Sequence, residues 1–308
     1  MAMSNELLRT LVTLEEERHA SISKARFWAA PILLLAGFAA LVIHGHHSTG
    51  GTIMALVVGI ILAAIVYNYL ISKVVKRFKQ QIMPILLEDI DPSLSYYFDG
   101  SIDLDEFNQP GMFTQPDRFS GKDVVQGTIG QTAIKFSLVD AEEERQHTST
   151  DSDGRTSTTT TYVTIFKGLF FIADFNKNFA GRTLVKPHSW NIFDKLFGST
   201  LTLEDPEFNK LFTVQSTDQV EGRYIMTPSL MDKFKLLHDK VGDFQACFIQ
   251  GRLFMAINLP QNFFEPAMNE SLADSQQIKK IMTNLKMITG LVEDLGLNVR
   301  IWGTKTNS

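Results

Sequence analysis

Residues 1–26 repeat apolar side chains at the spacing of one helical face. The stripe consists of Leu7, Leu11, Leu14 and Ile22, and the acidic run Glu15–Glu17 falls on other faces. This pattern predicts an amphipathic helix. We weigh three surroundings for its apolar face: the soluble part of the chain, a second copy of the chain, or solvent.

Two continuously apolar segments follow, at residues 27–43 and 52–71, and neither contains a charged side chain. At about 1.5 Å per residue they extend over about 25 and 30 Å, enough to cross the hydrocarbon core of a membrane. Residues 27–71 therefore predict a transmembrane hairpin. Small residues four positions apart would let its two helices approach closely, namely Ala36 with Ala40 and Gly59 with Ala63.

Basic residues flank the apolar segments but are missing from the loop at residues 44–51. They are Arg18, Lys24 and Arg26 before the hairpin and Lys73, Lys76, Arg77 and Lys79 after it. The positive-inside rule places both chain ends in the cytoplasm and the loop at 44–51 outside. Residues 72–92 predict a juxtamembrane helix or linker, broken near Pro84.

Residues 93–308 predict a cytoplasmic α+β domain with a mainly antiparallel sheet. Two β-hairpins are expected, with turns at 129–131 and 250–251. Residues 164–175 are apolar on both faces, which is typical of a strand inside the core. Gly168 within that strand indicates a bulge or a close backbone approach.

Helix signals appear twice in the same domain, and a terminal strand is expected after them. Thr227 followed by Pro228 is a good helix start. A second helix is expected from Asp274 to Leu295, with Gln277 as its capping-box partner. Residues 297–301 alternate apolar and polar side chains, which predicts the strand, and residues 190–197 hold large apolar groups that need cover.

Residues 142–161 contain almost no apolar side chain. Their sequence is EEERQHTSTDSDGRTSTTTT. A segment of this composition buries too little surface to order itself. We expect a long mobile loop between two paired strands.

Charge is divided unevenly along the chain. Residues 1–80 hold 8 Lys and Arg against 4 Asp and Glu, out of 29 and 34 in the whole chain, so residues 81–308 hold 21 against 30. An acidic soluble part lacks the basic surface that binds phosphates, which argues against nucleic acid as a partner. One cysteine, Cys247, agrees with a reducing compartment.

The sequence contains no GxSxG, P-loop, GxGxxG or HExxH motif, so the common hydrolase, nucleotide-binding and zinc-protease classes have no support. No cofactor is expected. Three weaker candidates for chemistry remain: a metal site at His44, His46 and His47, a cation-binding cluster of Asp103, Asp105 and Glu106, and a Cys-His pair drawn from His188, His238 and Cys247. For each, a structural role competes with the chemical one.

The best candidate binding site is the turn after the central strand. It holds Asp174, Asn176, Lys177, Asn178 and Arg182, flanked by Phe175 and Phe179. Polar strand-end residues beside exposed aromatic rings are typical of a recognition surface. In the competing interpretation the two phenylalanines pack beneath the turn and Arg182 pairs with an acidic neighbour.

The order of these segments resembles a bacterial membrane-protein family known only as a domain of unknown function, number 3137 in that series. The matching segments are LVTLEEER, a two-span hairpin, DRFSGKDVVQGTIGQTAIKFSLVDAEEE and TIFKGLFFIADFNKNFAGRTLVKP, and the most specific part is IFKGLFFIADFNKNFAGRTLV. The resemblance covers nearly the whole chain. It implies a two-span protein of the bacterial inner membrane with a cytoplasmic C-terminal domain, and it implies no activity.

These observations favour a membrane-anchored adaptor that binds a protein of unknown identity or a membrane component, without catalysis. An enzyme with a polar pocket near Asp174 and Arg182 is the first alternative. Metal handling through the outer histidines is the second. Besides the lipid bilayer, a second copy of the chain is an expected partner.

Overall fold

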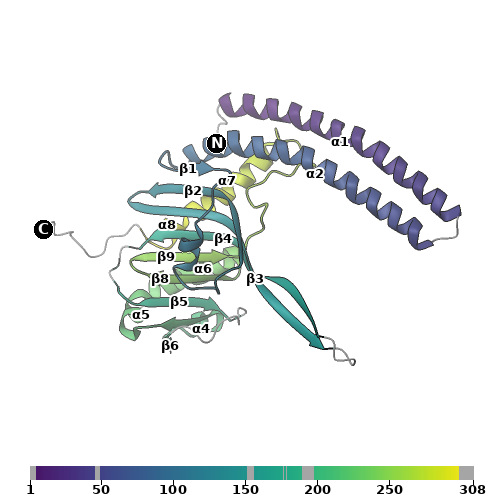
Figure 1. Ribbon diagram of the computed structural model, residues 1–308. Helices are drawn as coiled ribbons and strands as arrows, with labels where there is room; N and C mark the ends of the chain where they lie inside the picture. Colours follow the sequence, from purple (N-terminus) through teal and green to yellow (C-terminus); the bar gives the residue numbers. More distant parts are fainter. Residues whose placement is uncertain are drawn as a thin grey trace. The chain divides into compact units, whose positions relative to one another are not determined.

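The computed structural model describes residues 5–45, 49–150, 156–175, 177, 179–188 and 198–297. The chain forms two compact units (Figure 1). One comprises Met1–Leu86 with Phe264–Thr283, and the other comprises Leu87–Phe263 with Asn284–Ser308. The expected single domain at 93–308 is therefore interrupted, because residues 264–283 belong with the N-terminal helices.

The N-terminal unit is built on two helices, α1 (Asn5–Gly45) and α2 (Thr49–Glu88). Both are long and apolar enough to cross a membrane. In their most apolar 18-residue segments, only 6% and 11%, respectively, is buried. The amphipathic segment and the first apolar segment form one continuous helix. The expected break near Pro84 is wrong, because α2 continues through it with Ile82, Met83 and Leu86 buried.

The small residues of the two helices meet as the sequence predicts. A Cβ atom on Gly59 would lie 2.2 Å from the Cβ of Ala36. Ala40 and Ala63 are buried. Because any larger side chain at Gly59 would collide with α1, the glycine sets how closely the helices approach.

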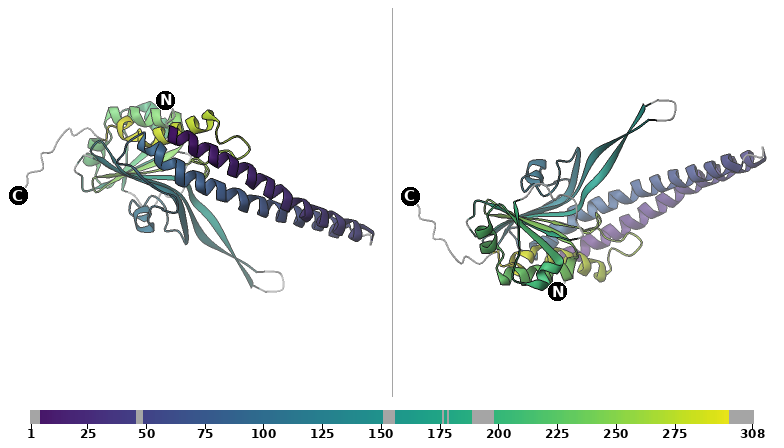
Figure 2. Two further views of the ribbon diagram at one scale, coloured as in Figure 1. Left: turned by 90° about the horizontal axis from the view of Figure 1, so that it is seen from above. Right: turned by 90° about the horizontal axis from the view of Figure 1, so that it is seen from below.

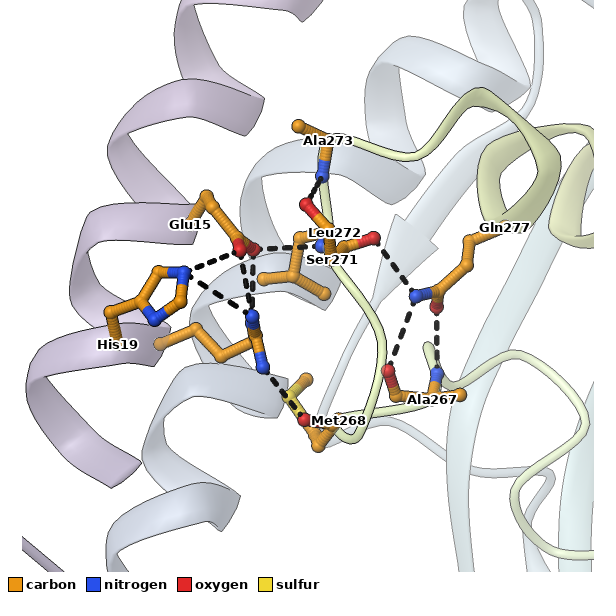
Figure 3. A network of polar contacts seen from close by, with 9 residues as sticks. Glu15, His19, Ala267, Met268, Ser271, Leu272, Ala273 and Gln277 are labelled. Carbon is orange, nitrogen blue, oxygen red and sulfur yellow. Dashed lines mark hydrogen bonds and ion pairs between the residues drawn. The ribbon is translucent and has the colours of Figure 1, made fainter. Parts of the chain in front are cut away.

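A partly buried network of polar groups fixes α1 to the loop before α7 (Ser275–Thr289) (Figure 3). The Glu15 carboxylate accepts hydrogen bonds from Arg18, at 2.7 and 2.9 Å, and from the backbone N–H of Leu272, at 2.8 Å. Arg18 also donates to the carbonyl oxygen of Met268 at 3.0 Å. We call these four residues the Glu15–Arg18 clamp. The apolar stripe beside it is buried at Leu7, Leu11 and Leu14, so this face of α1 is docked.

The same loop is held at two further points. Lys79 of α2 is 1% exposed and donates to Glu265 at 2.9 Å. Gln277 bonds to Ala267 and Ser271 and thereby closes the loop from within (Figure 3). Its side chain is therefore committed to the loop, which corrects the expected capping box, while Asp274 does accept from the N–H of Gln276 at 2.9 Å.

The described strands of the second unit form one sheet of nine strands, and every neighbouring pair is antiparallel. The order is β1-β2-β3-β4-β9-β8-β5-β7-β6. The bounds are β1 Ser95–Tyr97, β2 Arg118–Ile129, β3 Thr132–Thr150, β4 Thr156–Asp174, β5 Arg182–Pro187, β6 Ser199–Leu201, β7 Phe212–Ser216, β8 Phe244–Ile249 and β9 Arg252–Ile257. The α+β class and both expected hairpins are confirmed.

Helices complete the unit, with bounds α3 Leu104–Asn108, α4 Pro206–Leu211, α5 Gln219–Ile225, α6 Pro228–Val241 and α8 Leu291–Asp294. Thr227 caps α6 as expected, accepting from the N–H of Leu230 at 3.3 Å. The expected helix from Asp274 to Leu295 is divided, since α7 ends at Thr289 and Gly290, a poor helix former, precedes α8.

Both faces of the sheet are covered by aromatic clusters. On one face Phe107 of α3 lies 5.0 Å from Phe170 of β4, between ring centroids. On the other, Phe234 of α6 lies 5.3 Å from Phe244 of β8. The central position of β4 and the close approach at Gly168 are confirmed, because a Cβ there would lie 2.3 Å from the carbonyl oxygen of Ile257.

Strands β3 and β4 extend beyond the sheet as a two-stranded ribbon, which we call the arm and define as residues 143–150 and 156–163 (Figures 1 and 2). The expected loop at 142–161 is therefore wrong at 142–150 and 156–161, which are strand. Threonine favours extended backbone, and ladder hydrogen bonds form without burial. Cross-strand hydroxyl pairs add to them, at 3.4 Å for Thr148 with Thr158 and 3.2 Å for Ser149 with Ser157.

Two expectations lie outside the described residues. They are the strand at 297–301, apart from the buried Leu297, and the apolar segment at 190–197.

Candidate functional site

The polar turn expected as a binding site crosses the end of the sheet. It joins β4 to β5, which are separated by β9 and β8. The turn therefore passes over the hairpin turn Gln250–Gly251, and the N–H of Phe175 donates to the carbonyl oxygen of Gly251 at 2.8 Å. Two connections distant in sequence are thus held together at one end of the sheet.

Helix α5 fastens the other side of the turn. The Glu221 carboxylate accepts from the N–H groups of Ala180, at 3.1 Å, and Gly181, at 2.7 Å. The Thr217 hydroxyl accepts from the N–H of Arg182 at 2.8 Å. A Cβ on Gly181 would lie 2.7 Å from Glu221 Oε2 and 2.9 Å from Thr217 Oγ1, so a larger residue there would have to displace these two side chains.

The expected site residues have different surroundings. Asp174 is exposed at the end of β4, opposite Arg252. Lys177 donates to the carbonyl oxygen of Tyr224 at 2.8 Å, and its ammonium lies 4.6 Å from the centre of the Tyr224 ring. Burial lowers the pKa of Lys177. Asn176 and Asn178 lie outside the described residues.

Arg182 and the two phenylalanines face inward. Arg182 donates to the carbonyl oxygen of Pro110 at 3.2 Å, and burial lowers its pKa. Phe175 and Phe179 are buried, and the Phe175 ring lies 4.9 Å from that of Phe248. The packing expected in the structural interpretation is therefore present for both rings, and neither is an exposed aromatic contact.

Sequence reasoning missed the exposed apolar side chains beside Lys177. Val220 is 79% exposed and Tyr224 is 45% exposed, one turn apart on α5. Glu221, which lies between them on α5, lines an open depression of about 450 Å³ together with Phe179, Ala180, Gln250 and Gly251. We call Lys177, Val220, Tyr224 and these lining residues the Lys177–Tyr224 surface. The i, i+4 spacing of Val220 and Tyr224 can be read from the sequence, but the exposure of their side chains cannot.

The composition of this surface is typical of protein surfaces that make contacts with other molecules. It combines apolar area, an aromatic ring and an ammonium group on one part of the molecule. Asp174 and Arg182, the pair considered for an enzyme, do not line the depression.

The other candidates for chemistry include the carboxylate cluster and Cys247, and the contacts of their described residues indicate structural roles. Lys135 lies 2.6 Å from Glu106 and 3.8 Å from Asp103. Burial raises the pKa of Cys247 to about 12, so its thiol stays protonated and unreactive. Over the part of the chain that the structure describes, no group of three His, Cys, Asp or Glu side chains is placed to hold a metal ion.

His44 lies in the last turn of α1, whereas His46 and His47 lie outside the described residues. The metal site at the three histidines therefore stays a prediction. His188 and His238 have partners other than Cys247, since His188 Nε2 lies 2.9 Å from the Asn209 carbonyl oxygen and His238 Nε2 lies 3.2 Å from Asp243.

The fold defines a class of protein: two long apolar helices joined to an α+β unit with a large antiparallel sheet. Residues 164–297 match the model of a family described as protein of unknown function, DUF3137. The expected resemblance is confirmed over those residues, which include the polar turn and α5. No curated protein matches the sequence.

A solved structure is also similar to this chain. It is the crystal structure of the mycobacterial trehalose monomycolate transport factor A, TtfA, with 11% identity and a TM-score of 0.36. The similarity covers 67% of this chain and 90% of that one.

Proposed function

We propose that this protein is a membrane-anchored binding module whose sheet unit binds a protein partner through the Lys177–Tyr224 surface, without catalysis. The single observation that carries the proposal is the exposure of Val220 and Tyr224, one turn apart on α5, with the Lys177 ammonium over the Tyr224 ring. Neighbouring exposed apolar side chains mark interaction sites more often than isolated ones do.

The anchor in this proposal is the α1–α2 hairpin. Large apolar side chains are exposed along both helices, for example Leu34 at 74% and Met54 at 69%. The hydrocarbon core of a bilayer would surround these side chains with apolar groups, whereas their exposure to water is unfavourable. The basic residues at both flanks put the chain ends in the cytoplasm and the loop at 44–51 outside. In this proposal the membrane is the bacterial inner membrane.

Cysteine labelling tests this topology. Cys247 is fully buried, so an added cysteine would be the reactive one. We expect a membrane-impermeant maleimide to label His44→Cys in intact cells, and to label His147→Cys, on the arm, only after lysis. Labelling of His147→Cys in intact cells would contradict the orientation.

The binding surface offers complementary contacts to a peptide. Lys177 uses one N–H on Tyr224, and an ammonium has three donors, so it can also bind a carboxylate. Val220 and Tyr224 supply apolar area that becomes buried on binding. Because Glu221, Gly181 and Thr217 fix α5 to the turn, the surface is already organised before a partner arrives.

Photo-crosslinking tests the surface in the full chain. A benzophenone amino acid would replace Val220, with Leu236 as a matched control because it is also an exposed apolar residue on a helix, at 62%. We expect a discrete adduct from position 220 that is absent from position 236 and lost in a Lys177→Glu background. Identical adducts from both positions, or none from 220, would reject the proposed surface.

A further inference from the structure

The arm is a ribbon without a third strand in the described part of the chain. Residues 156–162 of β4 are exposed on both faces, and β4 meets β9 only from Leu169 to Asp174. A two-stranded ribbon alone in water is marginally stable, and additional strands stabilise it. A stabilising third strand would have to pair with one of the two outer edges of the arm, on β3 or on β4.

The β3 edge is already partly occupied at its base. The N–H of Asp117 donates to the Glu142 carbonyl oxygen at 2.9 Å, and the N–H of Glu144 donates to the Asp117 carboxylate at 2.7 Å. The Thr114 hydroxyl donates to Glu143 at 2.8 Å. Beyond these contacts the strand carries Arg145 and His147. Occupied backbone groups and charged side chains make this edge a poor site for strand addition.

The β4 edge has the opposite character. Its residues 157–163 read STTTTYV, with no charge and no proline. Exposed sheet edges are normally protected by charges, prolines or bulges. The β-bulge in this ladder lies lower, where Ile165 is the extra residue between the pairs Ala141–Phe166 and Glu142–Thr164. The upper part of the β4 edge is therefore regular and unprotected.

A second copy of the same edge is the partner that this composition fits best. Two-fold antiparallel pairing places like residues near one another, so a charged edge would repel itself and a neutral one does not. Within the arm, Thr148–Thr158 and Ser149–Ser157 already pair hydroxyl to hydroxyl. Self-pairing of β4 repeats that arrangement with Thr and Ser opposite Thr.

We propose that two copies of this chain pair through residues 157–163 of β4, forming a four-stranded antiparallel sheet from two arms. The inference does not depend on the Lys177–Tyr224 surface, because no residue of that surface belongs to the arm. It names a use for the Thr-rich segment and assigns the second copy as its occupant.

Disulfide crosslinking in membranes that contain the full chain tests this pairing. Single substitutions Thr159→Cys, Thr160→Cys and Thr161→Cys place a thiol at or next to residue 160, the centre of the segment 157–163, and Cys247 is too buried to interfere. Copper phenanthroline would serve as oxidant. We expect at least one of the three variants to yield a disulfide-linked species of twice the chain mass.

Gln146→Cys is the matched control, because Gln146 lies opposite Thr160 on β3. In the paired sheet, two copies of this position are three strand spacings apart, about 14 Å, beyond the reach of a disulfide. A Thr158→Lys/Thr160→Lys background should reduce crosslinking of Thr159→Cys at least tenfold. Monomer from all three β4 positions, equal crosslinking at position 146, or an adduct with a different protein would overturn the proposal.

Discussion

Two polar regions of this protein look alike in sequence but differ in the structure. The Glu15–Arg18 clamp reads as the solvated side of a helix, yet it is largely buried and bonded to the loop backbone at Met268 and Leu272. The Asp174–Arg182 turn reads as a recognition surface, yet Arg182 is directed inward. Of its described polar side chains, Lys177 is the one beside exposed apolar neighbours.

The comparison teaches that polarity alone does not assign a role. In the clamp, each polar group is satisfied by a partner distant in the sequence, so its contribution is to stability. At the Lys177–Tyr224 surface, exposed area remains available, and our proposal assigns this surface to binding. The two roles predict opposite responses to mutation, and the following experiments use that difference.

The largest effect is expected for Arg18→Met. The change removes both Arg18 hydrogen bonds from the partly buried Glu15 carboxylate, which keeps His19, at 3.0 Å, as a side-chain partner, and breaking such a pair costs about 3 kcal/mol. Hydrogen exchange of residues 264–277, measured by mass spectrometry on the full chain, should accelerate by about 100-fold if it occurs through local opening. In the double variant Glu15→Met/Arg18→Met, exchange of these residues should accelerate by a smaller factor. Unchanged exchange in Arg18→Met would show that the clamp does not hold the loop.

Acid should loosen the same loop to a smaller extent. The hydrogen bonds from Arg18 hold the pKa of Glu15 at about 2, below the ordinary 4.5. A carboxyl with a lowered folded-state pKa stabilises the fold above about pH 4.5, and that contribution is lost as pH falls toward 2. Exchange of residues 264–277, corrected for its intrinsic pH dependence, should therefore rise from pH 5 to pH 3. Glu15→Gln should remove this pH response.

An intermediate effect is expected for Glu221→Ala in the second unit. The change removes the acceptor for the N–H groups of Ala180 and Gly181, and an unsatisfied donor costs about 1–2 kcal/mol. Limited proteolysis should cut the turn at 176–181 faster, while α6 keeps its protection. Partner crosslinking from position 220 should also weaken, because α5 is then less firmly placed.

The smallest effect on stability is expected for Val220→Ser. Val220 is 79% exposed, and surface substitutions of this kind change stability by less than about 0.5 kcal/mol. Its thermal unfolding midpoint in detergent should match that of the unchanged protein, whereas capture of the partner identified by crosslinking should fall. Leu236→Ser, exposed on α6, should leave both unchanged. A large loss of stability in Val220→Ser would place this residue with the clamp and not with the binding surface.

Much of the fold was predictable because it depends on local patterns. The apolar segments, the Thr227 cap and the hairpin at 250–251 each depend on neighbouring residues, and all three are confirmed as structure. The arm was missed because the prediction weighed burial and neglected ladder hydrogen bonds and the preference of threonine for strands. The break at Pro84 was wrong because buried neighbours keep α2 helical.

By itself the sequence determined the two apolar helices, the antiparallel α+β class and the location of the polar turn between two core strands. Only the tertiary structure decided which polar groups are internal, that the loop before α7 joins the N-terminal helices, and that α5 brings Tyr224 beside Lys177 and leaves Val220 exposed. The physical reason is the distance along the chain over which each effect acts. Periodicity and capping act over a few residues, whereas burial and exposure depend on contacts between segments as far apart as Glu15 and Leu272.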